Sequence, residues 1–156
     1  KGLGCHGAAI LGSQKLTDYL VNFARSFVYT TGLSPHALAT IKTAYNQLAI
    51  LNDSEESHQH KLQHNIQFFK SEVIRLKLQN IFIESNSAIH CCVIYGNEKA
   101  KKIASQLNEK GFAVKAILSP TVSAGEERLR FCLHSYNSAK EITKVLENLS
   151  IFVSSP

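Results

Sequence analysis

Lys1 begins the stretch KGLGCHGAAILGS, in which small residues surround a lysine ahead of an apolar run. An amine that a closely packed loop keeps away from water has a lowered pKa and forms Schiff bases with carbonyl compounds. Lys1 is therefore a candidate nucleophile, and the alternative interpretation is a terminal lysine without a chemical role. Because the chain starts on a lysine and contains no methionine, we expect it to be the back part of a longer protein.

Arg130 lies in RLRFCLH, where apolar and polar residues alternate with the period of a β-strand. The alternation leaves two interpretations open. Arg130 points to solvent, or it faces a cleft in which its planar guanidinium binds a carboxylate through two parallel hydrogen bonds.

Thr30 and Thr31 follow a β-branched and aromatic stretch and precede a turn at Gly32. Hydroxyls in such a position often bond only to local backbone groups. The second interpretation is that the two hydroxyls bind a phosphate together with other donors held on a rigid frame.

His60 and His64 have the i, i+4 spacing at which two histidines can share a metal on one helix face. The stretch HQHKLQH contains no HExxH motif and no third ligand at a fixed offset. We therefore expect a solvent-exposed helix face here and no metal site.

The composition excludes several classes of protein. The net charge of +5 is dispersed, because EKAKK and EERLR mix acids with bases, so we expect no nucleic-acid partner. No run approaches the roughly 20 apolar residues of a membrane span, so we expect no membrane partner. Four cysteines occur without a CxxC motif, and we expect reduced thiols and a cytoplasmic protein; they are Cys5, Cys91, Cys92 and Cys132.

In the first half of the chain, apolar spacing predicts helices over residues 14–27 and 36–51. GAAILGS at 7–13 predicts a short buried strand, and VYTTGLSP at 28–35 predicts a second β segment. A long helix then starts near Asp53, a candidate cap with Glu56 three residues later, and reaches Asn80. Its apolar stripe consists of Leu62, Ile66, Phe69, Val73 and Leu76.

The second half predicts strands over 88–95, 112–118 and 128–134, with a helix over 96–111 that ends at Gly111. A last helix over 139–149 is capped by Asn137 or Ser138. The fold class is thus α/β, of an α+β kind, with a three-stranded sheet and helices packed on one face. We divide the chain into a remnant of a larger domain (1–52), a bridging helix (53–84) and a small α/β domain (85–156).

Four segments resemble, in order, the C-terminal part of the α-oxoamine synthases. They are KGLGCHGAAILGS, ARSFVYTTGLSPHALA, HKLQHNIQFF and the region that runs from SAIHCCVIYGNEK to HSYNSAKEI. These enzymes depend on pyridoxal phosphate, have the fold type I of aminotransferases of class I/II, and condense an amino acid with an acyl-CoA while CO2 is lost. SPTVSAGEERLRF is similar to the family pattern PPTVPxGxxRLR, although Ser119 and Ser123 stand where prolines are common.

The resemblance implies a role for each candidate residue. Lys1 matches the lysine that bonds to pyridoxal phosphate and then removes a proton from the amino acid. Thr30 and Thr31 match the hydroxyl pair that reaches the cofactor phosphate of the neighbouring subunit in a homodimer. Arg130 matches the arginine that binds the substrate carboxylate. The family's ring-stacking histidine and the acid that pairs with the ring nitrogen lie upstream of Lys1, so we expect residues 1–156 alone to be inactive.

The implied activity is that of a C-acyltransferase. HGAAIL is more similar to the members that join L-alanine to pimeloyl-CoA in biotin biosynthesis than to those with a double glycine at this point. Two alternatives stay open. The first is another α-oxoamine synthase, such as a 2-amino-3-ketobutyrate CoA ligase or an enzyme for a longer acyl chain. The second is a non-catalytic α/β module for packing or dimerisation.

Overall fold

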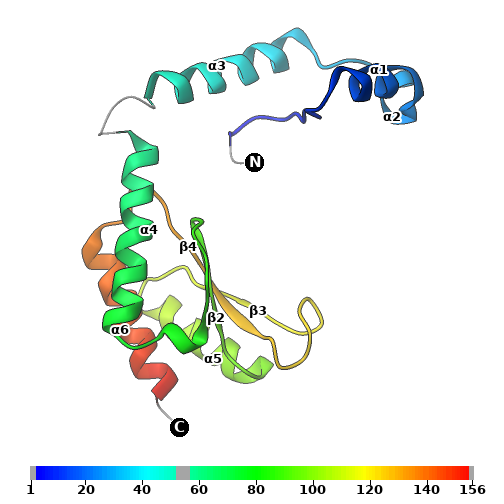
Figure 1. Cartoon of the computed structure of the whole chain (residues 1–156). Coiled ribbons are helices and arrows are strands. Elements are labelled where there is room, and N and C mark those ends of the chain that lie inside the picture. Colours follow the sequence, from blue (N-terminus) through cyan, green and yellow to red (C-terminus); the bar gives the residue numbers. More distant parts are fainter. Residues whose placement is uncertain (1–2, 52–56, 155–156) are drawn as a thin grey trace. The chain divides into compact units, whose positions relative to one another are not determined.

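The computed structural model describes residues 3–51 and 57–154. The chain separates into two compact units, Lys1–Asp53 and Ser54–Pro156. Each unit is described by itself below (Figure 1).

The first unit is helical. Helix α1 (Gln14–Phe23) begins after Ser13, whose hydroxyl accepts a hydrogen bond from the Leu16 amide, and ends at Ala24. A short helix α2 (Arg25–Val28) follows. Helix α3 (Pro35–Leu51) begins on a proline, which has no backbone N–H that would lack an acceptor at the start of a helix. The predicted helices are therefore confirmed, with a break at Ala24 inside the first.

The two β segments predicted for this unit are wrong. Residues 7–13 have no regular secondary structure, and Val28 ends α2. A strand needs a neighbouring strand to satisfy its amides and carbonyls, and residues 3–51 supply none. An apolar run alone does not reveal whether such a neighbour exists.

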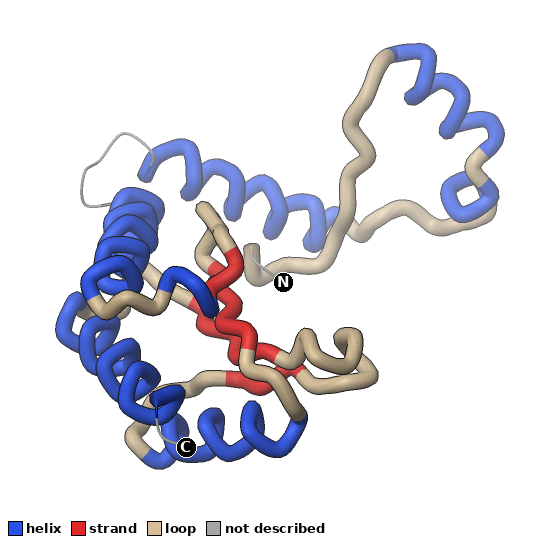
Figure 2. The backbone as a smooth tube through the Cα atoms, turned by 60° about the horizontal axis from the view of Figure 1, so that its bottom comes forward, coloured by secondary structure: helices blue, strands red, loops and turns tan. Residues whose placement is uncertain are grey.

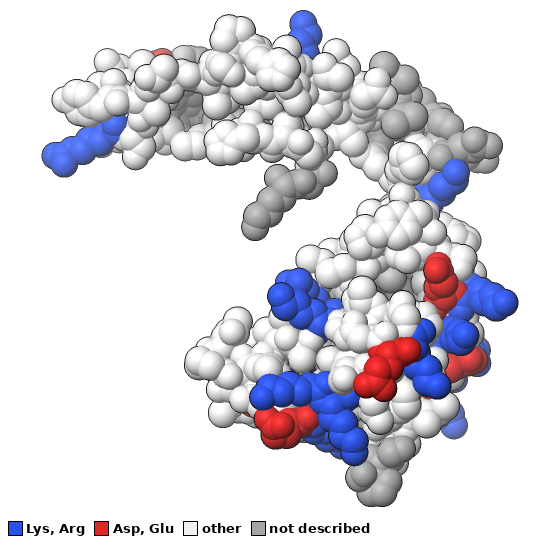
Figure 3. Space-filling view, turned by 180° about the vertical axis from the view of Figure 1, so that it is seen from behind, with Lys and Arg blue, Asp and Glu red and all other residues white. Residues whose placement is uncertain are grey.

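The described side chains of this unit form no interior. No residue from 3 to 49 is buried. Even large apolar residues are between 68% and 90% exposed, namely Ile10, Leu11, Phe23 and Tyr29. Only four residues between 3 and 51 carry charge, so this part is nearly free of coloured side chains in Figure 3. An apolar groove of about 420 Å³ runs between α1, α2 and the segment that precedes them.

The second unit is a small α+β domain. Helix α4 (His58–Arg75) leads through a 3-10 turn η1 (Gln79–Ile81) into strands β1 (Phe82–Ile83) and β2 (Ile89–Val93). Helix α5 (Asn97–Glu109), strands β3 (Lys115–Ile117) and β4 (Arg128–Cys132) and helix α6 (Ala139–Ser154) follow. The strands form an antiparallel sheet in the order β1-β2-β4-β3. The sheet has four strands, whereas three were predicted. The prediction missed β1 because this strand is too short to show a period in the sequence.

Helix boundaries follow local capping. Ser57 caps α4 by accepting a hydrogen bond from the His60 amide, whereas the predicted cap Asp53 lies outside the described residues. Gly111 follows α5 with a φ of +88°, as expected for a glycine that ends a helix. Ser138 and Glu141 form reciprocal hydrogen bonds at the start of α6, which confirms one of the two predicted caps.

One face of the sheet is covered by α4, α5 and α6 (Figure 2). The stripe predicted for α4 packs there, because Ile66, Phe69 and Val73 are buried and its two end residues are partly buried. The alternation predicted for β4 also holds, with Leu129 and Phe131 in the core. Arg130 consequently lies on the opposite face of the sheet.

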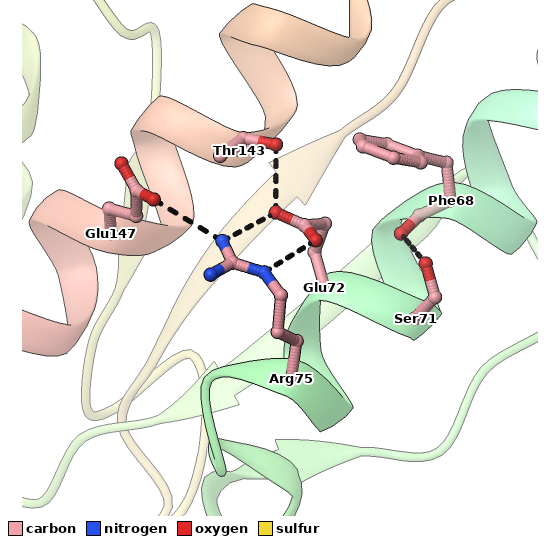
Figure 4. Close-up of polar contacts among 6 residues, drawn as sticks. All are labelled: Phe68, Ser71, Glu72, Arg75, Thr143 and Glu147. Atoms are coloured by element: carbon pink, nitrogen blue, oxygen red, sulfur yellow. Dashed lines mark hydrogen bonds and ion pairs between the residues drawn. The ribbon is translucent and has the colours of Figure 1, made fainter.

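A polar network joins α4 to α6 (Figure 4). Arg75 donates two hydrogen bonds to the Glu72 carboxylate, from Nε at 2.7 Å and from Nη2 at 2.8 Å, and Thr143 donates a third at 2.7 Å. Arg75 also bonds to Glu147 at 3.2 Å. The bonds from Arg75, and then the bond from Thr143, hold the pKa of the buried Glu72 below its ordinary value. The network therefore fixes the orientation of the two helices with charged groups that are all partnered.

His90 is a polar residue inside this core. The residue is 3% exposed and its ring stacks on Phe69 with ring centroids 4.5 Å apart. Its Nε2 has no hydrogen-bond partner among the described residues. Burial, and to a lesser degree the charge of Lys70, lowers its pKa.

We expect acid to destabilise this domain through His90. The pKa is lowered on folding, so the unfolded chain binds the extra proton first, and stability falls as pH drops below about 6.5, by at most about 1.4 kcal/mol per pH unit. In urea unfolding followed by circular dichroism, His90→Leu should flatten this dependence between pH 6.5 and 5. The matched change at exposed His64, His64→Leu, should leave it in place. Equal slopes for the wild type and His90→Leu would contradict the prediction.

Candidate functional site

Arg130 occupies the middle of β4, between two other strands. Its register partners are Cys91 on β2 and Lys115 on the edge strand β3. The side chain is half-buried, and its Nε is shielded from water without a hydrogen-bond partner among the described residues. A shielded guanidinium nitrogen without an acceptor is costly, so this position is suited to an anionic ligand.

A pocket of about 570 Å³ adjoins this arginine at the edge of the sheet. Lys115, Arg130 and Cys132 line it from the strands, and Lys101 and Asn108 line it from α5. No acidic residue is among its lining residues. Of its cations, Lys101 forms an ion pair with Glu98 at 2.9 Å. The other two cations, Lys115 and Arg130, form no ion pair with a described residue, so the pocket carries a positive charge.

The loop that leads into β4 is held at both ends. Asn97 accepts a hydrogen bond from the Ser119 amide at 3.0 Å. Glu127, which is 4% exposed, accepts bonds from the Gly96 and Gly125 amides, each at 3.0 Å. The bond from Gly96 is the main reason that the pKa of Glu127 is below its ordinary value. The start of α5 and the 119–127 loop are thereby fixed relative to the arginine strand.

We expect Glu127→Ala to free this loop without unfolding the domain. The Gly96 and Gly125 amides lose their acceptor, and their hydrogen exchange should accelerate by about tenfold or more. The neighbouring Glu126 provides a matched control, because its exposed carboxylate hydrogen-bonds, within the described residues, to Arg128 and not to these amides. If Glu126→Ala accelerates the exchange of these amides as much as Glu127→Ala does, Glu127 does not hold the loop. Acid should reproduce the loosening, because stability from a carboxylate with a lowered pKa is lost as pH falls through that pKa.

Thr30 and Thr31 lie in the first unit, directly after α2, and both are exposed. The Thr30 hydroxyl donates to the Ser26 carbonyl at 2.5 Å, which is the local backbone role that such residues often have. The Thr31 hydroxyl has no partner among the described residues and is free to bond to a ligand. Lys1 lies outside the described residues.

Taken unit by unit, the residues present fit a phosphorylated cofactor in part. The hydroxyl of Thr31 is an available phosphate donor, whereas that of Thr30 donates to the Ser26 carbonyl. Arg130 offers its unpartnered Nε to a carboxylate. The donors that the sequence singled out are therefore present on the surface of each unit.

His60 and His64 are both exposed, which confirms the prediction of a solvent-exposed helix face. Among the residues that the structure describes, no three metal-binding side chains come together. None of the helices in the described ranges is long and apolar enough to cross a membrane.

Sequence reasoning missed Glu127 and Asn97. Glu127 binds the amide of Gly96, which lies 31 positions away, and Asn97 binds Ser119 across 22 positions. The available signals were a glutamate directly before the arginine strand and an asparagine after a glycine at the start of a helix. Neither signal reveals its distant partner.

Known proteins resemble the chain over nearly its whole length. A model of the family described as "Aminotransferase class I and II" matches residues 1–149. An 8-amino-7-oxononanoate synthase of Emericella nidulans is 36% identical over 155 residues, which are 98% of this chain and 37% of the relative. The enzyme of the same name from Citrobacter koseri is 38% identical over 151 residues, which are 96% of this chain and 38% of the relative.

Solved structures agree with the fold. An 8-amino-7-oxononanoate synthase of Francisella tularensis matches with a TM-score of 0.81 at 29% identity, over 98% of this chain and 43% of that one. A serine palmitoyltransferase of Sphingomonas wittichii matches with a TM-score of 0.75 at 20% identity, over 97% and 37%, and shows a shared fold only. The chain spans less than half the length of the relatives that it matches.

Proposed function

The chain belongs to the aminotransferase class I and II family, and from that premise we propose that the whole protein is a pyridoxal-phosphate-dependent acyltransferase of the α-oxoamine synthase kind. Its substrates are L-alanine and pimeloyl-CoA, and its products are 8-amino-7-oxononanoate, CoA and CO2, in the cytoplasmic synthesis of biotin. The names of the relatives support the product, 8-amino-7-oxononanoate. The observation that carries the proposal is the half-buried Arg130, whose shielded Nε lacks an acceptor.

Each candidate residue has a task in this reaction. Arg130 binds the carboxylate of the amino acid and so orients its Cα–H bond. The Lys1 amine removes the Cα proton as the general base. Thr30 and Thr31 hydrogen-bond to the phosphate of the cofactor bound by the neighbouring subunit of a homodimer. When bound, pyridoxal phosphate supplies the electron sink that makes this proton acidic.

A panel assay of the whole protein tests the substrates. CoA release should be fastest with L-alanine and pimeloyl-CoA, and slower when L-serine or glycine replaces alanine or when palmitoyl-CoA or acetyl-CoA replaces the pimeloyl thioester. Residues 1–156 alone should release no CoA under the same conditions. A clear preference for L-serine with palmitoyl-CoA, or for glycine with acetyl-CoA, would replace the proposed substrates with those of another member of the family.

A further inference from the structure

Lys115 and Arg130 form a pair of cations without a neighbouring acidic residue in the described part of the chain, on the sheet face opposite to the one that α4, α5 and α6 cover. They are direct register partners of β3 and β4, so their Cβ atoms lie about 4.5–5.5 Å apart on the same face. Like charges directly opposite each other destabilise a sheet. A ligand that carries the opposite charge would remove this repulsion.

The protein itself supplies no such charge among the described residues. Other cations of this domain form ion pairs, as Arg128 does with Glu126, but neither Lys115 nor Arg130 takes part in one. The cross-strand row continues from Arg130 to Cys91 and then to Ile83, and both of these are uncharged or apolar. The positive charge is therefore left for something that binds.

The two cations differ in a way that suits a shared carboxylate. Arg130 is half-buried and its geometry is fixed by the central strand, whereas Lys115 is exposed on the edge strand. A guanidinium binds the two carboxylate oxygens in a fixed plane, and an ammonium on a flexible stem can approach the same oxygens from the side. Both residues line the same pocket.

We propose that Lys115 is the second cation of the carboxylate site, so that the substrate carboxylate binds between its ammonium and the guanidinium of Arg130. This inference rests on the proposed role of Arg130. It adds a residue to the site that determines how tightly the amino acid binds. Because Lys115 is exposed and screened by salt, its contribution is smaller than that of Arg130.

Nuclear magnetic resonance of the 156-residue chain tests the proposal directly. The Arg130 Nε–H resonance is assigned by its loss in Arg130→Lys, and the chain has only four arginines. Titration with sodium acetate or L-alanine should shift this resonance in a saturable manner, whereas sodium chloride at equal ionic strength should not. Lys115→Met should weaken the apparent affinity by about fivefold, and Lys115→Arg should restore most of it.

Two controls separate the possible failures. Lys140→Met removes an exposed lysine of α6 that does not line the pocket, and should leave the affinity unchanged. If acetate shifts Arg130 equally well in the wild type and in Lys115→Met, the role of Lys115 is refuted while that of Arg130 stands. If the Arg130 resonance does not respond to acetate or L-alanine at all, both roles are refuted. In the whole protein, Lys115→Met should raise the KM for the amino acid by about fivefold and leave kcat unchanged.

Discussion

Lys1→Ala is expected to lower kcat of the whole protein by roughly a thousandfold or more. The substitution removes both the amine that bonds to the cofactor and the base that takes the Cα proton, and a positioned base alone contributes about 10²–10⁴-fold. Borohydride reduction of the wild-type protein with pyridoxal phosphate, followed by peptide mapping, should place the pyridoxyl group on Lys1.

The exposed Lys15 provides the control for this experiment. It lies in the first turn of α1, so Lys15→Ala should keep both the activity and the tag on Lys1. Lys1→Ala should carry no tag. A pyridoxyl group on any other side chain of the wild type would refute the assignment of Lys1 and the enzyme function that depends on it.

Arg130→Ala should raise the KM for the amino acid by roughly 30- to 150-fold. Removing one partner of a shielded, hydrogen-bonded charge pair costs about 2–3 kcal/mol, and the loss falls on the substrate that carries the carboxylate. The KM for the acyl-CoA should stay the same, because Arg130 has no role in binding the thioester. Steady-state kinetics with each substrate varied in turn measures both effects.

The neighbouring Arg128 provides a matched control on the same strand and the same face. Its Nε donates to the Glu126 carbonyl at 2.8 Å, so it is already occupied, and Arg128→Ala should change the KM for the amino acid by less than the Arg130 substitution does. Arg130→Lys should recover part of the affinity, because it keeps the charge but loses the two parallel bonds. An unchanged KM in Arg130→Ala would remove this residue from the site.

Much of the second unit could be predicted from the sequence, because its signals are local. The stripe that includes Ile66 and Phe69 and the alternation around Arg130 both depend on the period of one element, and both are observed. The alternation also limited Arg130 to a face of the sheet. It could not distinguish a solvated arginine from a shielded one, since that depends on Lys115 and Cys91 from two other strands.

The failures concern contacts between segments that are far apart in the sequence. A strand was predicted at 7–13, but these residues have no regular secondary structure. The prediction failed because an apolar run does not reveal whether a pairing partner is available. Glu127 was missed because its meaning lies in the amide of Gly96. Strand β1 was missed because it is defined by two register pairs with Cys91 and Cys92 rather than by a pattern of its own.

The absence of buried residues from 3 to 49 has a consequence for how the chain responds to a protease. Proteolysis needs local opening, and the free energy of opening is low where few apolar contacts have to be broken. Helices α1 to α3 should therefore be digested first, while the sheet and the helices α4 to α6 persist as a resistant fragment. Digestion would thus convert a chain of two units into one, and the surviving piece would carry Arg130 but neither of the two threonines.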